Sequence, residues 1–300
     1  MVFKVGVTRD LKTKSGEPCF RPRAFEALQA NTDIAWEWVA EDMSELTPDV
    51  AARYDALHLN LPRVTAASVA RADCRVKIIA RNGVGYDSVD VEALTARGIV
   101  LTNTPTAVRR PVAVATLTMI FALAGRLFEK DKLVRTNRWN DRVDYMGLGL
   151  TCRTLALIGA GSIGQEIIRL ARPFFKRIIA ADPHIDAATI AGLGAERVAF
   201  DEAMRAGDFV VVCCLLTPET RHLVDARALA LMRPTAFFIN VGRGPIHDEA
   251  ALVDVLRRRA IAGAGLDVLE QEPTPADNPL LKLDNTILTP HALCWTDECF

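Results

Sequence analysis

Three glycines in the middle of the chain constrain its fold more than any other feature. Gly159, Gly161 and Gly164 stand in the spacing G-x-G-x-x-G within the stretch LALIGAGSIGQEIIRLA. An apolar strand is predicted over Leu155–Ile158, directly before the glycines, and an amphipathic helix over Ile163–Ala171, directly after them. A glycine-rich turn between a buried strand and a helix is typical of a doubly wound, Rossmann-type sheet that binds a dinucleotide.

The spacing also predicts what each part of this turn does. Gly159 permits the tight turn, Gly161 lets the backbone approach a pyrophosphate, and Gly164 lets helix and strand pack closely. The N–H groups at the start of the helix offer a partial positive charge to that pyrophosphate. Asp182 ends the next predicted strand, IIAAD, where its carboxylate would accept hydrogen bonds from the ribose hydroxyls and repel a 2′-phosphate. The sequence therefore predicts an NAD site, with NAD preferred over NADP.

Short apolar runs alternate with helical patterns along the rest of the chain, which favours an α/β fold with parallel sheets. In the first hundred residues, helices are predicted near 22–30, 66–72 and 89–96, and the predicted strands are FKVGVT, DALHLNL, KIIAR and GIVLTN. A buried helix is predicted from Val112 toward Trp139, and its apolar run is judged too short to span a bilayer. The second series of predicted strands is RTLALIG, RIIAAD, DFVVVCC, AFFIN, IAGAGLDV and TILTP.

The composition narrows the class of protein. Half of the 300 residues are apolar and 24% are charged, which is typical of globular domains. The formal net charge of −1 predicts no nucleic-acid partner. The seven cysteines include no C-x-x-C pair, so we expect reduced thiols, a cytoplasmic location and no metal site. Lys4 and Arg9 interrupt the N-terminal apolar residues, so we expect neither a secretory signal nor a membrane partner.

Charged side chains follow three of the predicted strands of the second series. Arg243 stands between two glycines in NVGRG, Glu272 follows Asp267 in LDVLEQEP, and His291 stands in TPHALCWT. Taken singly, they have plainer interpretations: a surface ion pair, a solvated loop acid and a capping or surface histidine. Because open α/β sheets bind their ligands at the carboxyl ends of the strands, the three together predict a catalytic set.

These motifs, in this order, resemble those of the D-isomer-specific 2-hydroxyacid dehydrogenase family. The resemblance runs from about Val50 to the last residue and is carried by KIIARNGVGYDSVDVEAL, LTNTP, GAGSIG, ADP, LTPET, NVGRG, LDVLEQEP and TPHALCWT. The family includes phosphoglycerate dehydrogenases, glyoxylate/hydroxypyruvate reductases and D-lactate-type enzymes. The resemblance implies an NAD-dependent oxidoreductase that interconverts a small 2-keto acid and its D-2-hydroxy acid.

The resemblance also implies a role for each residue. Arg243 would bind the substrate carboxylate and polarise the keto oxygen, His291 would be the acid/base, and Glu272 would be its partner. Negative charge develops on the keto oxygen during reduction, which calls for a cation and a proton donor, and a carboxylate beside an imidazole favours the imidazolium. The loop of the first domain would bind the substrate through Asn82, Val84 and Gly85. The cofactor contacts implied are Gly159, Gly161, Ser162, Ile163, Gly164, Asp182, Val241, Gly242, Arg243 and Asp267.

By the same resemblance, residues 1–103 form a flavodoxin-like α/β substrate domain that residues 291–300 complete, and residues 104–290 form the NAD-binding Rossmann domain. A homodimer is implied, formed through the cofactor domain and the long helix. Family chains continue beyond the histidine motif, so we expect this sequence, ending at Phe300, to lack a closing segment. Two alternatives stay open. One is a D-3-phosphoglycerate dehydrogenase, with Arg81, Arg109 and Arg110 as candidate phosphate ligands, and the other is a non-catalytic, NAD-sensing protein like the corepressors of this fold.

Overall fold

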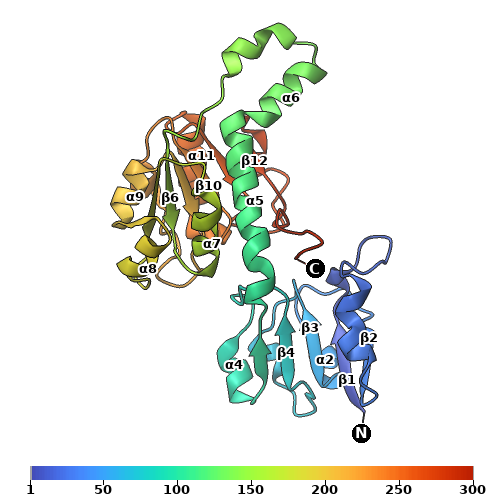
Figure 1. Cartoon of the computed structure of the whole chain (residues 1–300). Helices are drawn as coiled ribbons and strands as arrows, with labels where there is room; N and C mark the ends of the chain where they lie inside the picture. Colours follow the sequence, from blue (N-terminus) through green and yellow to red (C-terminus); the bar gives the residue numbers. More distant parts are fainter. Residues whose placement is uncertain (1, 300) are drawn as a thin grey trace. The chain divides into compact units, whose positions relative to one another are not determined.

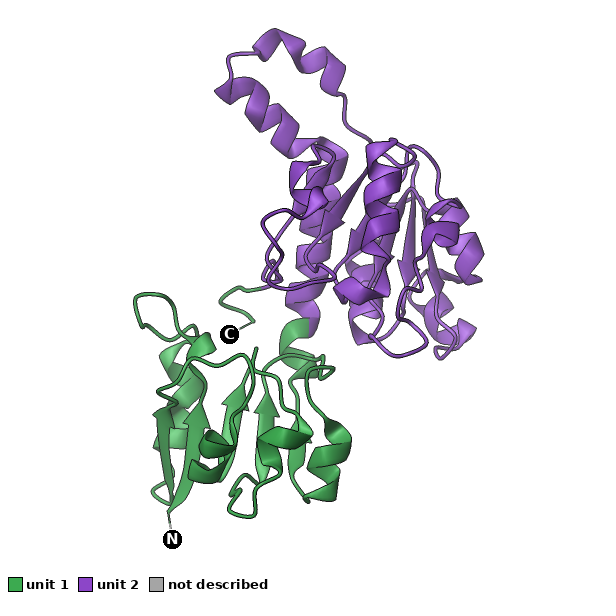
Figure 2. Cartoon of the chain, turned by 180° about the vertical axis from the view of Figure 1, so that it is seen from behind, with its two compact units in different colours: residues 1–108, 295–300 green, residues 109–294 purple. Residues whose placement is uncertain are grey.

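The computed structural model describes residues 2–299, which form two compact units (Figure 2). Unit 1 contains the residues up to Val108 and those from Trp295 on, and unit 2 contains residues 109–294. The sequence analysis placed the two boundaries a few residues earlier, at 103/104 and 290/291. The substrate and cofactor roles that it assigned to the two domains stay predictions.

Unit 1 is built on a sheet of five strands in the order β2-β1-β3-β4-β5, and every pair of neighbours is parallel (Figure 1). The strands are β1 (Phe3–Val7), β2 (Ile34–Trp38), β3 (Ala56–Leu59), β4 (Ile78–Arg81) and β5 (Val100–Thr102). Its α-helices are α1 (Glu26–Gln29), α2 (Pro48–Arg53), α3 (Ala66–Val69) and α4 (Val91–Ala96), with the 3-10 helices η1 (Arg9–Leu11) and η2 (Pro22–Phe25).

Strand β2 and helix α2 were not predicted. The sequence of β2, IAWEW, alternates half-buried and exposed residues because β2 is an edge strand with one covered face. The ring of Phe25 stacks on that of Trp36, with the centroids 4.8 Å apart, and so covers this face. An edge strand of this kind lacks the continuous apolar run by which the other strands of unit 1 were recognised.

Unit 2 is built on a parallel sheet of seven strands in the order β12-β11-β10-β9-β6-β7-β8. Its strands are β6 (Thr154–Ile158), β7 (Arg177–Ala181), β8 (Glu196–Arg197), β9 (Phe209–Val212), β10 (Phe237–Asn240), β11 (Gly263–Leu266) and β12 (Thr286–Leu288). Its helices include α7 (Ser162–Ala171), α8 (Ala187–Gly192), α9 (Phe200–Ala206), α10 (Ala226–Leu229), α11 (Glu249–Arg257), η4 (Gly244–Ile246) and η5 (Pro279–Lys282).

Both faces of this sheet are covered by helices, which explains the apolar runs in its sequence. Leu155 and Leu157 pack with residues of α7 and of the long helix α5 (Pro105–Gly125) on one face. Ala156 and Ile158 pack with residues of α9, α10 and α11 on the other face. Six of the seven strands match predicted strands, and the exception is β8, a short polar edge strand.

Helix α5 differs from its prediction at both ends. It begins at Pro105 rather than at Val112, and it ends at Gly125 because Arg126 adopts a left-handed conformation with φ 52°. The chain continues as α6 (Leu127–Arg135) and η3 (Trp139–Tyr145). The apolar run judged too short for a bilayer is part of this longer helix, whose 21 residues are long and apolar enough to cross a membrane by length and composition alone. Within the structure, 61% of its most apolar window is buried, as in the core helix of a soluble protein.

Candidate functional site

The glycine turn lies at the carboxyl end of β6, where close contacts require two of its glycines. Gly159 has φ 103°, and a Cβ placed there would lie 2.7 Å from the backbone N of Cys214. A Cβ on Gly164 would lie 2.5 Å from the carbonyl oxygen of Gly159, so this residue lets α7 approach the turn. A Cβ on Gly161, at the N-cap of α7, would meet nothing within 4 Å. Open space before a helix N-terminus fits the pyrophosphate of a dinucleotide.

Asp182 follows β7, the strand beside β6, and its carboxylate lies against the glycine turn. Asp182 Oδ2 accepts a hydrogen bond of 2.7 Å from the backbone N of Ala160. Asp182 Oδ1 accepts hydrogen bonds from the backbone N of His184 (2.8 Å) and of Ile185 (3.2 Å). The carboxylate therefore shapes the turn. Because each of its oxygens can accept more than one hydrogen bond, it still fits a ribose hydroxyl donor.

Arg243 follows β10, and the side chain of Asn240 holds its backbone. Asn240 Nδ2 donates to the carbonyl oxygen of Arg243 (2.9 Å), and Asn240 Oδ1 accepts from the backbone N of Gly242 (2.9 Å). A Cβ on Gly244 would collide with the backbone of Leu269, so the chain directly after Arg243 packs closely against the loop that follows β11. The sequence analysis missed Asn240, whose only signal is an amide at the end of an apolar strand.

The same amide binds a buried histidine that was also missed. Asn240 Nδ2 lies 2.9 Å from His247 Nδ1, and both side chains are fully buried. Burial lowers the pKa of His247 to about 4, so its ring is neutral at pH 7. An amide nitrogen only donates, so Nδ1 must accept and the ring proton is on Nε2. Its sequence context, GPIHDEAAL, gave no sign of this contact.

Asp267, predicted to contact the cofactor, organises the loop that carries His291. It follows β11, and its Oδ1 accepts hydrogen bonds from Thr289 Oγ1 (2.6 Å) and from the backbone N of Ala292 and of Leu293 (3.1 Å each). These bonds lie on both sides of His291 in the chain. Asp267 therefore holds the histidine loop at the carboxyl end of the sheet.

His291 pairs with Glu272, so it is not a solitary surface histidine. His291 Nδ1 lies 2.7 Å from Glu272 Oε2, and both side chains are 39% exposed. Glu272 Oε1 accepts a hydrogen bond of 3.0 Å from the backbone N of Leu269. Burial favours a higher pKa for Glu272, but the hydrogen bond and charge of His291, the N–H of Leu269 and the charge of Arg243 outweigh it and lower the pKa. Glu272 is therefore ionised at neutral pH.

The predicted substrate residues Asn82, Val84 and Gly85 belong to unit 1, whereas Arg243, Glu272 and His291 belong to unit 2. The loop with the first three follows β4, and the backbone N of Asn82 donates to Leu59 O (2.8 Å). The backbone N of Gly83, with φ 114°, donates to Thr104 Oγ1 (2.8 Å), and Val84 O accepts from Asn103 Nδ2 (2.9 Å). These contacts hold the loop half-exposed at the carboxyl edge of its own sheet.

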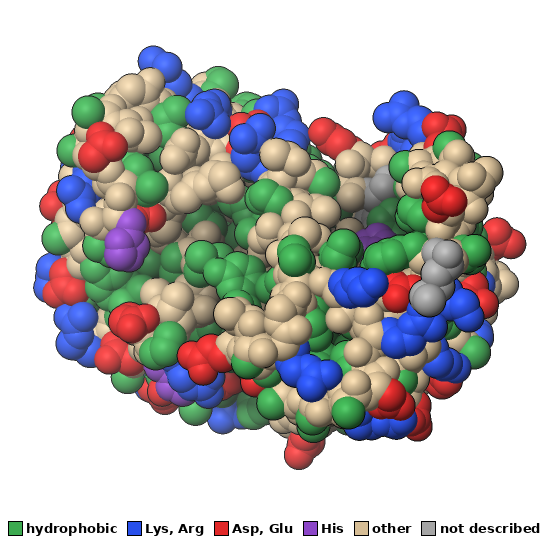
Figure 3. Space-filling view, turned by 90° about the horizontal axis from the view of Figure 1, so that it is seen from below, with side chains coloured by type: hydrophobic (Ala, Val, Ile, Leu, Met, Phe, Trp, Pro, Cys, Tyr) green, Lys and Arg blue, Asp and Glu red, His purple; other side chains and the backbone are tan. Residues whose placement is uncertain are grey.

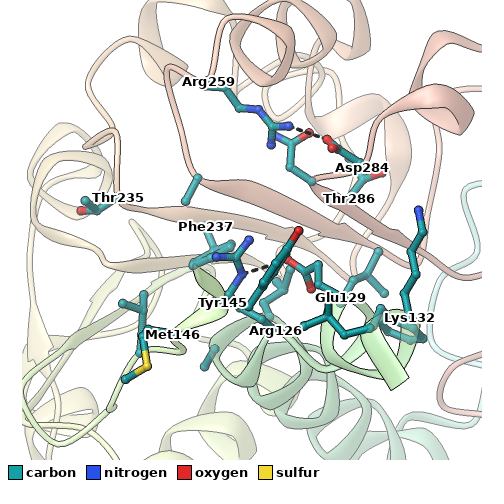
Figure 4. A pocket seen from close by; sticks show the side chains of 18 of the residues that line it. Arg126, Glu129, Lys132, Tyr145, Met146, Thr235, Phe237, Arg259, Asp284 and Thr286 are labelled. Atoms are coloured by element: carbon teal, nitrogen blue, oxygen red, sulfur yellow. Dashed lines mark hydrogen bonds and ion pairs between the residues drawn. The ribbon is translucent and has the colours of Figure 1, made fainter. Parts of the chain in front are cut away.

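A cavity of about 660 Å³ in unit 2 lies at the opposite edge of the sheet. It is lined by residues at the amino ends of β10 and β12, among them Phe237 and Thr286, and by residues of α6 and the segment after it. Figure 4 shows the Arg126–Glu129 and Arg259–Asp284 ion pairs in its wall. None of the predicted site residues lines it. Among residues 2–299, no group of three or more His, Cys, Asp or Glu side chains could hold a metal ion.

Comparison with known proteins decides the family. Residues 117–292 match the family model described as D-isomer specific 2-hydroxyacid dehydrogenase, NAD binding domain. The chain belongs to this family. It is therefore an NAD-dependent 2-hydroxyacid dehydrogenase by family, with a Rossmann domain for the cofactor.

Curated relatives carry two different substrate names. The chain is 38% identical over 262 residues to the glyoxylate reductase of Thermococcus onnurineus, covering 85% of this chain and 78% of that one. It is 39% identical over 237 residues to the D-3-phosphoglycerate dehydrogenase of Methanocaldococcus jannaschii, covering 79% of this chain and 45% of that one. The chain therefore spans about half of the phosphoglycerate dehydrogenases that it matches. Among solved structures, a glyoxylate reductase from Paecilomyes thermophila superposes with a TM-score of 0.83 at 27% identity, covering 100% of this chain and 91% of that one.

Proposed function

We propose that the protein reduces a small 2-keto acid to its D-2-hydroxy acid with NADH and catalyses the reverse oxidation, with His291 as the acid/base. The observation that carries this assignment is the 2.7 Å pair between His291 Nδ1 and Glu272 Oε2. It lies at the carboxyl edge of the sheet, the same edge that bears the glycine turn. An imidazole held there by a carboxylate is suited to move a proton next to a bound dinucleotide.

In this proposal three residues of unit 2 have separate roles in the reaction of the substrate. NADH, when bound, supplies the hydride for the carbonyl carbon. Arg243 binds the substrate carboxylate and stabilises the negative charge that develops on the keto oxygen. Glu272 occupies Nδ1 of His291, which leaves Nε2 to give a proton to that oxygen, or to take one from the hydroxyl in the reverse direction.

The residues of unit 1 are assigned to substrate binding. The backbone N–H groups of Val84 and Gly85, with Asn82 beside them, would bind the substrate carboxylate. The loop is fixed by its hydrogen bonds to Leu59 and Thr104, which supports a preformed anion site. Unit 1 would then be the substrate domain and unit 2 the cofactor domain.

The position of the glycine turn suggests which residues contact the bound cofactor. Ser162 and Ile163 begin α7, so their N–H groups would face the pyrophosphate together with the turn at Gly161. Asp182 would accept from the ribose hydroxyls and disfavour the 2′-phosphate of NADP. The backbones at Val241 and Gly242, and the carboxylate of Asp267, would lie along the nicotinamide half.

The test is NADH consumption with glyoxylate, hydroxypyruvate, pyruvate, phenylpyruvate and 3-phosphohydroxypyruvate, with NADH binding measured alongside. We expect turnover of one or more of the unphosphorylated acids. The His291→Ala variant should lose turnover by about a hundredfold or more and still bind NADH with nearly unchanged affinity. An unchanged rate in this variant would remove the catalytic assignment, and NADH binding without turnover of any acid by the wild-type protein would favour the NAD-sensing alternative.

The proposal extends to the assembly and its location. We infer a homodimer, because α6 and η3 project from the rest of unit 2 (Figure 1), and this part of the chain exposes apolar side chains. Phe128, Trp139, Val143 and Met146 are 58%, 60%, 68% and 75% exposed. A second copy would cover them. We also infer a cytoplasmic location, in keeping with seven cysteines that include no C-x-x-C pair. Positive and negative side chains are interspersed on the face that Figure 3 shows.

A further inference from the structure

A histidine of unit 2 links the two segments that carry Arg243 and Glu272. His222 Nε2 lies 2.7 Å from Glu270 Oε1. Since a carboxylate only accepts hydrogen bonds, Nε2 is the donor. His222 lies in the segment between β9 and α10, and Glu270 lies in the segment after β11, so the bond joins two strand-end segments on either side of β10. Neither residue was predicted to belong to the site.

The backbone of His222 is bound to the segment that carries Arg243. The N–H of His222 donates to the carbonyl oxygen of Pro245 at 2.9 Å, two residues after Arg243. The N–H of Val224 donates to the carbonyl oxygen of Ile246 at 3.1 Å. These two bonds fix the backbone of His222 against the chain that follows Arg243.

Glu270 fixes the segment that carries Glu272. Glu270 Oε2 accepts from the backbone N of Glu249 at 3.3 Å, and the backbone N of Glu270 donates to Glu249 Oε2 at 3.0 Å. Glu249 is the first residue of α11, so these reciprocal bonds tie the segment to the start of a helix. Glu270 directly follows Leu269, whose N–H donates to Glu272 Oε1 at 3.0 Å. The backbone that holds the Glu272 carboxylate is therefore held in turn by Glu270.

The two segments also contact each other directly. A Cβ on Gly244 would collide with the carbonyl oxygen of Leu269 and with the backbone N of Glu270. Such a van der Waals contact fixes how close the segments lie but leaves them free to slide. A hydrogen bond has a preferred direction as well as a distance, so the bond between His222 and Glu270 restricts that sliding.

The exposure of this pair distinguishes an effect on stability from an effect on rate. The side chains of His222 and Glu270 are 40% and 30% exposed. Ion pairs exposed to this extent contribute about 0–1 kcal/mol to the stability of a fold. In contrast, a displacement of about 1 Å between reacting groups can lower the rate of a reaction by about a hundredfold. The pair is therefore suited to fix geometry rather than to stabilise the fold.

We propose that His222 and Glu270 are positioning residues of the proposed reaction. Their hydrogen bond sets where Glu272, and with it His291, lies relative to Arg243. Both groups have to reach the keto oxygen together, because Arg243 stabilises its developing charge while His291 supplies the proton. His222 and Glu270 act through these residues and not on the substrate. This inference rests on the proposed function and names two further residues on which that function depends.

The test is His222→Ala, assayed with the 2-keto acid that the wild-type protein turns over best. We expect kcat, counted per NADH-binding site, to fall by about tenfold, with KM and NADH affinity within about twofold of the wild type. The melting temperature should stay nearly unchanged because the pair is exposed. Counting NADH-binding sites removes any loss of folded protein from kcat, so a purely structural role would leave this value unchanged.

A second pair of variants isolates the hydrogen bond. His222 has φ 50°, so alanine and glutamine at this position carry the same left-handed strain and differ only in the side chain. The amide of glutamine can donate to Glu270 in place of Nε2, so His222→Gln should recover most of kcat. Adding His222→Ala to Glu270→Ala should lower kcat by less than about twofold further, because the bond is already absent.

The matched control is Asp201→Ala, which removes exposed ion pairs with Arg205 and Arg227 elsewhere in unit 2 and should keep kcat within about twofold. If His222→Ala keeps the wild-type kcat, or if His222→Gln is no better than His222→Ala, the bond does not position the site, and the proposed function is untouched. A wild-type protein that turns over none of the 2-keto acids would overturn the proposed function and this inference with it.

Discussion

At the scale of single residues, the candidate site depends on side chains whose hydrogen bonds fix the position of the predicted catalytic residues. Glu272 holds His291, Asp267 holds the loop around it, and Asn240 holds the backbone of Arg243. Each of the three holding residues ends or follows a strand of the unit 2 sheet. The position of the proposed acid/base is therefore set by residues at or after the strand ends of this sheet, which suits a reaction sensitive to small displacements.

The lowered pKa of Glu272 predicts a pH dependence of stability. Because its pKa is lower in the folded than in the unfolded chain, ionised Glu272 stabilises the fold above the ordinary carboxyl pKa of about 4.3, and this contribution is lost as the pH falls through the lowered value. Urea unfolding between pH 7 and pH 3 should therefore show a smaller loss of stability in Glu272→Gln than in the wild-type protein, with the difference arising below about pH 4.3. Equal losses would mean that the pair contributes nothing to the fold.

Asn240 is predicted to position Arg243. Asn240→Ala leaves Gly242 N, Arg243 O and His247 Nδ1 without their partner in a buried region, so we expect a loss of stability of about 2 kcal/mol or more. Under conditions where the variant is folded, kcat/KM should fall by about tenfold or more while NADH still binds. The control is Asn285→Ala, which removes one side-chain bond to Leu256 O. A loss of stability with unchanged kcat/KM would make the role of Asn240 purely structural.

At the scale of elements, two glycines in the turn between β6 and α7 and in α7 itself are expected to have different roles. One is needed for both the stability of the fold and NADH binding, and the other for NADH binding alone. A Cβ on Gly164 would meet the carbonyl of Gly159, whereas a Cβ on Gly161 would meet open space. Gly164→Ala should therefore lower the melting temperature and weaken NADH binding, because α7 must move away from the turn. Gly161→Ala should leave the melting temperature nearly unchanged and weaken NADH binding through contact with the ligand. If Gly161→Ala binds NADH normally, the pyrophosphate does not lie there.

At the scale of the whole molecule, the apolar surface of α6, η3 and the residue after it predicts self-association. Replacing Trp139 and Met146 together by Glu places two charges on this surface, where desolvating them would oppose contact with a second copy. Light scattering after size exclusion should give the mass of a dimer for the wild-type protein and of a monomer for the double variant. Leu281→Glu, at an exposed apolar position outside this surface, is the control. A monomeric wild-type protein would remove the dimer proposal.

The family, the two-domain α/β fold and the NAD-binding domain were all predicted from the sequence, because they depend on local patterns. Continuous apolar runs mark strands buried on both faces, and the glycine spacing marks a turn that other residues cannot form. What failed were elements without such patterns. The edge strands β2 and β8 are half-exposed or polar, and the start of α5 at Pro105 precedes the apolar run that was taken as its beginning.

Tertiary structure alone decided which partners the polar side chains have. The sequence named Arg243, Glu272 and His291 as strand-end residues, and the family resemblance implied that Glu272 is the partner of His291. The fold supplied the geometry of that pair, 2.7 Å between His291 Nδ1 and Glu272 Oε2. It also showed that Asn240 supports the arginine loop and that Asp10, which follows β1, accepts a hydrogen bond from the backbone N of Leu61, which lies after β3. Hydrogen bonds between distant residues depend on the register of neighbouring strands, which leaves no trace in the spacing of residues along the chain.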